Sequence, residues 1–102
     1  MEINDKKIKI EQNFTQTRLS MFDIHRKRYE KFQEDMKKSD LGQGYTRYLQ
    51  EFYILETLGE YAMEEGNSEN MNFVRENAQR VTKKLQDSFG ITIKSEILDK
   101  LQ

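Results

Sequence analysis

The sequence predicts an all-α fold, a three-helix bundle that contains an antiparallel helical hairpin and adds a short C-terminal helix. Apolar residues recur at spacings of three and four along most of the chain, which is the pattern of amphipathic helices. Proline is absent, so no residue forces a break inside a helix. The periodic segments are separated at Gly42, Gly44, Gly66 and Gly90, where the chain can reverse. We expect residues 1–102 to form a single helical domain.

The first helix is expected to begin at Asp5 or Lys9 and to end at Lys38, before the two glycines of the first turn. Its apolar residues fall along one stripe. The stripe consists of Ile10, Phe14, Thr17, Met21, Ile24, Phe32 and Met36.

The second helix, predicted over residues 45–64, is apolar on two opposite sides. One side holds Tyr45, Leu49, Phe52, Gly59 and Met63, and the other holds Ile54, Leu58 and Tyr61. A helix at the surface of a bundle needs only one apolar stripe. The second helix is therefore expected to be central, covered either by two neighbours in its own fold or by its own fold and a partner.

The third helix is predicted to begin after an N-cap at Ser68 and to close at Gly90. It has the cleanest amphipathic stripe: Met71, Val74, Ala78, Val81, Leu85 and Phe89. Residues 95–102 are expected to form the last short helix. An alternative for two β-branched segments, residues 7–10 and 91–94, is a small two-stranded ribbon.

Composition limits the classes of function. Cysteine is absent, which excludes disulfides and thiol chemistry, and no metal-ligand spacing or nucleotide motif is present. Charged residues make up 34% of the chain, yet the net charge is −1, as expected for solvated helix faces. The first five residues contain no apolar signal core, and no run approaches the length of a membrane span. We expect a non-enzymatic protein without cofactor, metal or membrane contact, in the cytoplasm or exported without a cleaved signal.

Two charges fall inside apolar stripes and are candidate partners. Arg28 lies in the stripe of the first helix and Glu56 in that of the second, and an antiparallel hairpin would place them opposite each other. Burying either charge alone would be costly, whereas together they can be satisfied. His25, the only histidine, would lie about one turn away. The pair is expected to fix the register of the hairpin, and the alternative is a pocket that binds a small polar ligand.

The first helix also carries a basic cluster with an interleaved tyrosine. Arg26, Lys27 and Lys31 could contact phosphates, which would make the protein a nucleic-acid-binding regulator. Acidic neighbours and a slightly acidic chain argue against that alternative.

The sequence favours a small protein-protein interaction module that acts as an adaptor, inhibitor or regulator and self-associates. The expected contact is the second stripe of the second helix, extended by apolar positions on the first helix. The predicted contact residues are Ile54, Leu58, Tyr61, Leu19 and Phe22. The module is expected to bind a protein partner or a second copy of itself through this stripe.

A further alternative comes from a family resemblance. The small size, the helix-turn-helix start, the absence of cysteine and the pattern Tyr61-x-x-x-Glu65 resemble the helical-hairpin proteins of type VII secretion, the ESAT-6-like class. The turn at Leu41 and Gly42 has no tryptophan, unlike the turn of that family. The resemblance implies an exported helical hairpin whose export depends on Tyr61 and Glu65.

Overall fold

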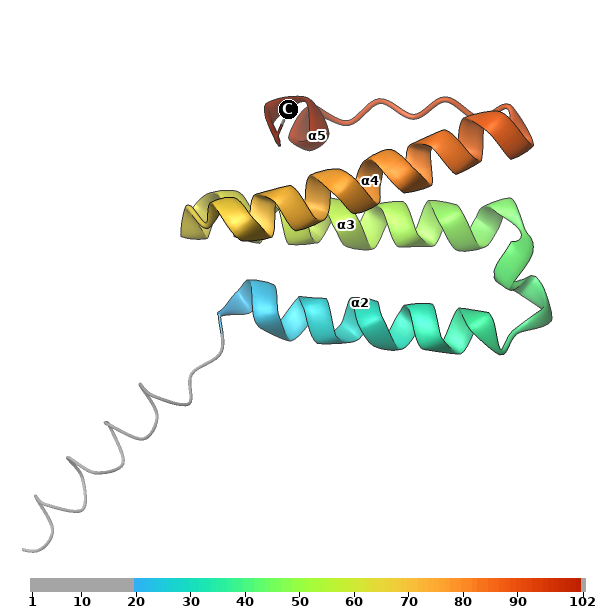
Figure 1. Cartoon of the computed structure of the whole chain (residues 1–102), viewed down its shortest axis with the longest axis horizontal. Coiled ribbons are helices and arrows are strands. Elements are labelled where there is room, and N and C mark those ends of the chain that lie inside the picture. Colours follow the sequence, from blue (N-terminus) through green and yellow to red (C-terminus); the bar gives the residue numbers. More distant parts are fainter. Residues whose placement is uncertain (1–19, 102) are drawn as a thin grey trace, which may run out of the picture.

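The protein is an all-α bundle in which one long helix lies between two others. A computed structural model describes residues 20–101 and contains helices α2 (Met21–Lys37), α3 (Tyr45–Glu65), α4 (Ser68–Phe89) and α5 (Glu96–Leu101). A 3-10 turn, η1 (Asp40–Gln43), joins α2 to α3. Helix α3 packs against α2 on one side and against α4 and α5 on the other (Figure 1). The predicted bundle, its hairpin and its short C-terminal helix are confirmed. None of these helices is long and apolar enough to cross a membrane.

Helix α2 begins at a serine cap and buries a different face from the one predicted. The Ser20 hydroxyl accepts a hydrogen bond from the amide of Asp23 at 3.1 Å. Phe22 and Tyr29 are fully buried, whereas Met21 is 45% exposed and Arg28 is exposed. The buried stripe is therefore rotated by about one residue from the predicted stripe. The residues of the first helix that precede Ser20 lie outside the described part of the chain.

The turn between α2 and α3 is held by a second serine cap and a close glycine contact. The Ser39 hydroxyl accepts from the amide of Leu41 at 3.1 Å. A Cβ atom added to Gly42 would lie 2.0 Å from the carbonyl oxygen of Met36, so only glycine fits there. The predicted break at the two glycines is confirmed.

Helix α3 is covered on both sides by the chain's own helices. Leu55, Leu58 and Ala62 are fully buried. At Gly59 an added Cβ would lie 2.8 Å from Ile97 of α5, so the missing side chain lets α5 approach closely. The two-sided pattern thus reflects two neighbours within the fold.

Helix α4 ends as predicted, and the chain then runs extended to α5. Asn67, one residue before the predicted Ser68, caps α4 by accepting from the amide of Asn70 at 3.1 Å. Gly90 has a φ of 66° and closes the helix in the left-handed conformation. Residues 91–95 form neither helix nor strand, and Ile91 and Ile93 pack against the core. The ribbon alternative also needed residues 7–10, which lie outside the described residues.

Candidate functional site

A carboxylate lies in the middle of the core. Glu51 is on the buried side of α3 and is 0% exposed. The Tyr29 hydroxyl of α2 donates a hydrogen bond to Glu51 Oε2 at 2.6 Å, and Arg80 of α4 donates to the same oxygen. Arg47, one turn earlier on α3, lies 3.1 Å from the other oxygen, Oε1. Glu51 therefore joins all three long helices.

The Tyr29 hydroxyl is the second centre of this cluster. Its one proton is donated to Glu51, so the groups around it act as donors. Gln33 Nε2 and Arg80 Nη2 each donate to it at 3.1 Å. Asn77 Oδ1 lies within 3.3 Å of Arg80 Nη2 and accepts from it. These contacts fix the Tyr29 ring, which also packs nearly perpendicular to the Phe73 ring.

The cluster holds two guanidinium groups and one carboxylate, so it carries an excess positive charge. Burial and the hydrogen bond to the Glu51 carboxylate raise the pKa of Tyr29 well above its ordinary value. Burial alone would lower the pKa of Arg80, but the hydrogen bond and charge of Glu51 outweigh it and raise that pKa. Tyr29 is thus neutral and Arg80 is charged at ordinary pH.

High pH is expected to destabilise the protein through Tyr29. Because its pKa is raised by folding, the folded protein keeps a proton that the unfolded chain releases above pH 10. Below that pH, Tyr29 makes its full contribution to the free energy of unfolding. As the pH rises toward the pKa of Tyr29 in the folded protein, this contribution should fall by about 1.4 kcal/mol per pH unit. Urea unfolding on both sides of pH 10 should show this slope in the wild type and in Tyr53→Phe, but not in Tyr29→Phe. Equal slopes in all three proteins would contradict the buried hydrogen bond.

Arg47 connects the buried cluster to a groove on the surface. The groove has a volume of about 380 Å³ and lies at the turn between α2 and α3. Leu41 is 78% exposed and Tyr45 is 52% exposed beside it. Among the described residues, Arg47 Nε is buried and has no hydrogen-bond partner. We call this the turn groove; its lining consists of Met36, Ser39, Leu41, Gly44, Tyr45, Thr46, Arg47 and Gln50.

The predicted pair between Arg28 and Glu56 does not form. Arg28 is exposed because the buried face of α2 is rotated away from it. Glu56 accepts a hydrogen bond from Ser95 at 2.9 Å and so helps to hold the segment before α5. His25 stacks on Tyr61 with ring centroids 4.9 Å apart. The hypothesis of a polar pocket formed by Arg28, Glu56 and His25 is therefore wrong.

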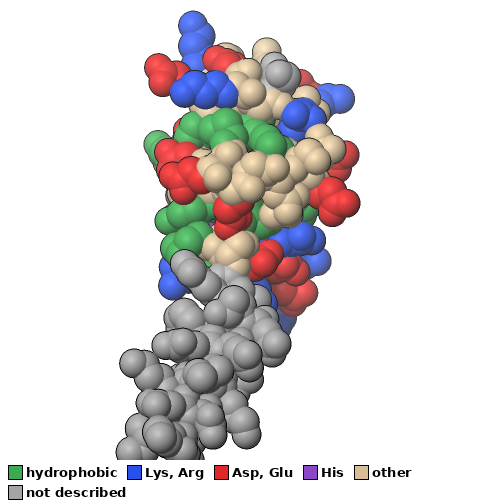
Figure 2. All heavy atoms as spheres, turned by 90° about the vertical axis from the view of Figure 1, so that its left-hand side faces the viewer, with side chains coloured by type: hydrophobic (Ala, Val, Ile, Leu, Met, Phe, Trp, Pro, Cys, Tyr) green, Lys and Arg blue, Asp and Glu red, His purple; other side chains and the backbone are tan. Residues whose placement is uncertain are grey.

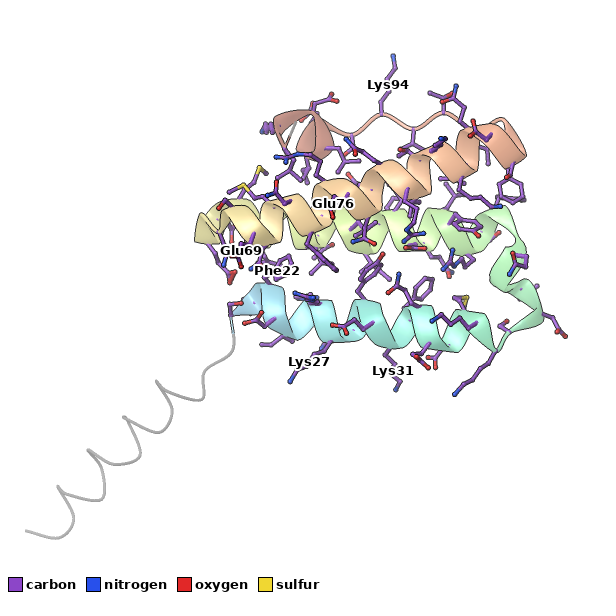
Figure 3. The ribbon with its side chains drawn as sticks, in the orientation of Figure 1. Phe22, Lys27, Lys31, Glu69, Glu76 and Lys94 are labelled. Carbon is purple, nitrogen blue, oxygen red and sulfur yellow. The ribbon has the colours of Figure 1, made fainter. Side chains whose placement is uncertain are left out.

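The basic cluster on α2 is divided between two environments. Arg26 lies over the Phe73 ring at 4.3 Å and 3.4 Å from Glu30, so it is held within the fold. Lys27 and Lys31 are exposed and point away from the bundle (Figure 3). The two lysines are thus fully presented to solvent beside the exposed Glu30, whereas the Arg26 side chain is 43% exposed and lies against Phe73.

Most of the predicted protein-binding stripe is occupied by the chain's own packing. Leu58 and Phe22 are fully buried in the core, so the prediction that they form an external contact is wrong. Ile54 and Tyr61 are half-buried and pack against the core. Leu19 lies outside the described residues.

Comparisons with known proteins complete the description of the site. No family model, curated protein or solved structure matches this chain.

Proposed function

We propose that this chain is a small non-enzymatic protein-binding module, and that it contacts its partner through the turn groove. As an adaptor, inhibitor or regulator, it would act by occupying a surface of that partner. A cytoplasmic location is part of the proposal and rests on the sequence pattern alone.

The observation that carries the proposal is the grouping of exposed apolar side chains. Within residues 20–101, the exposed large hydrophobic residues are Met21, Leu41, Tyr45 and Tyr53. Leu41 and Tyr45 line the groove, and Tyr53, 67% exposed, follows Gln50 of the groove by one helical turn. Exposed apolar patches with tyrosines at their edges are typical of protein interfaces. Met21 is isolated near the other end of α2, where Figure 2 shows hydrophobic side chains interrupted by acidic and basic ones.

The second stripe gives less support for self-association than the sequence suggested. Leu58 is its central residue, and its side chain is already covered. The turn groove adjoins the uncovered face of α3, where Gln50 and Tyr53 are exposed. A different protein is therefore the partner that we propose.

Charge placed in the groove is expected to abolish binding of the partner. Tagged wild type and a Leu41→Glu, Tyr45→Glu double variant would be purified from the organism that encodes the protein and compared by quantitative mass spectrometry. Each new carboxylate would have to lose its hydration in an apolar contact. The amount of copurified partner should therefore fall at least about tenfold. Met21→Glu is the matched control, because it adds a charge at an exposed apolar residue away from the groove.

The proposal fails if the same proteins copurify with the double variant and with Met21→Glu at equal levels. Circular dichroism of each variant separates loss of binding from loss of folding.

A further inference from the structure

Helix α5 fills a closely fitted site on α3 and α4. At Gly59 of α3 an added Cβ atom would lie 2.8 Å from Ile97 Cγ2 and 3.2 Å from Leu101 Cδ1, so α5 packs directly on the α3 backbone. Leu101 is 2% exposed, and Arg75 of α4 donates a hydrogen bond to its carbonyl oxygen. We call this surface of α3 and α4 the α5 site. Its shape shows which segment occupies it, because the contacts are those of α5 itself.

The connection between α4 and α5 allows α5 to leave this site without unfolding the other helices. Helix α5 has six residues, and a helix of that length is not stable without its packing contacts. The linker, residues 91–95, runs extended beside α4 and back toward its start (Figure 1). Opening of α5 is therefore a local event that leaves α2, α3 and α4 packed.

The linker has the side-chain pattern of a β-strand. Ile91, Ile93 and Ser95 face the fold, whereas Thr92 and Lys94 are exposed. Among the described residues, the backbone groups of residues 92–94 make no hydrogen bond to another backbone group. Free donors and acceptors along an extended segment are a template for pairing with a second extended segment. Two linkers that pass each other in opposite directions would supply these partners to one another.

We propose that two copies of this chain exchange α5, so that the α5 of each copy fills the α5 site of the other and the two linkers pair as an antiparallel ribbon. Each exchanged helix keeps the contacts that it makes within a single chain, so exchange loses no packing of α5. The ribbon adds backbone hydrogen bonds between the two linkers, and these favour the dimer. This self-association uses a surface other than the turn groove and is independent of the proposed function.

A disulfide that locks α5 onto its own chain tests the inference. The chain contains no cysteine, and positions 59 and 97 are close enough for a disulfide in the variant Gly59→Cys, Ile97→Cys. Native mass spectrometry over a concentration series should show a dimer of the wild type. The variant would be oxidised at high dilution, where the disulfide forms within one chain. It should then show at least about tenfold less dimer, because α5 cannot open, and reduction should restore the dimer.

Two outcomes of this measurement would overturn the exchange of α5. One is equal dimer in the oxidised and the reduced variant, which would place self-association elsewhere. The other is a wild type that stays monomeric at every concentration.

A mixture of two single variants identifies the copy that supplies α5. Isotopically labelled Ile97→Cys would be mixed with unlabelled Gly59→Cys and oxidised, and exchange should give a disulfide between the two chains. Glu60→Cys, at an exposed position next to Gly59, is the matched control and should give about fivefold less of the mixed product. Equal yields from Gly59→Cys and Glu60→Cys would contradict the exchange.

Hydrogen exchange tests the paired linkers. In an antiparallel ribbon alternate residues pair, so at least one amide of residues 92–94 should exchange about tenfold more slowly in the wild-type dimer than in the locked monomer. Equal rates at all these positions would contradict the ribbon. None of these variants changes the turn groove, so the proposed function is tested separately through Leu41 and Tyr45.

Discussion

Replacing Glu51 with alanine is expected to destabilise the bundle more than any substitution of a surface carboxylate. Glu51 is fully buried and contacts Tyr29, Arg47 and Arg80. Its removal leaves the Arg47 guanidinium without its buried counter-charge and the Tyr29 hydroxyl without its acceptor, and it opens a cavity. Breaking one partner of a buried ion pair costs about 3 kcal/mol, and the partial exposure of Arg80 keeps the expected loss near that value.

Chemical denaturation would measure the loss as a fall in the free energy of unfolding. Glu60→Ala, at an exposed position of the same helix, is the control and should change it by less than about 0.5 kcal/mol. In an Arg80→Ala background the effect of Glu51→Ala should be smaller, because the two residues share one interaction. A loss below about 1 kcal/mol in both backgrounds would show that the cluster contributes little to stability.

Replacing Gly42 with alanine is expected to deform the turn between α2 and α3. The new Cβ would lie 2.0 Å from the Met36 carbonyl oxygen, a backbone atom that cannot move without shifting the end of α2. Forcing extra atoms into such a contact costs about 3 kcal/mol. Since Met36 and Leu41 both line the turn groove, binding of the proposed partner protein should fall together with stability.

Gly44→Ala is the matched control for Gly42→Ala. A Cβ at Gly44 would lie 3.6 Å from the Leu41 carbonyl oxygen, an ordinary contact, and its φ of −84° suits any residue. Thermal unfolding should therefore separate the two variants by several degrees. Equal melting temperatures would mean that the turn can relax around a side chain at Gly42.

The helices were predictable because their boundaries are marked by local chemistry. Gly66 and Gly90 adopt the left-handed conformation that closes α3 and α4. A glycine at the end of an apolar stripe can be recognised as such a closing residue from the sequence. The central place of α3 followed from its two apolar sides. The fold could thus be derived from spacing and turn residues alone.

The buried face of α2 was harder to predict because Met21, Phe22 and Ile24 are all apolar. Either of two neighbouring faces of α2 could therefore be the buried one. Tyr29, whose hydroxyl is hydrogen-bonded in the core, lies on only one of these faces. The hairpin register was nearly right, since His25 meets Tyr61. The error in face alone was enough to pair Arg28 with Glu56.

The candidate site was missed for two physical reasons. Glu51 precedes Leu55 and Leu58 by four and seven residues, so it lies on the same side of the helix as these apolar residues, and the sequence contains this signal. Glu56 also falls inside an apolar stripe, so the sequence offered two candidates for a buried carboxylate. Arg80, the partner of Glu51, lies on α4, and the position of α4 depends on tertiary packing. The turn groove depends on the conformation of η1, which no periodicity encodes.

The central claim is that a partner protein binds at the turn groove and not at the second stripe of α3. Photo-crosslinking in the native cell tests it most directly, with benzoylphenylalanine placed at Leu41 or Tyr53 and, for comparison, at Ile54 or Tyr61. We predict one shared crosslinked partner from positions 41 and 53 and none from positions 54 and 61. Crosslinks from 54 and 61 without any from 41 and 53 would contradict the proposal and return the interface to the second stripe.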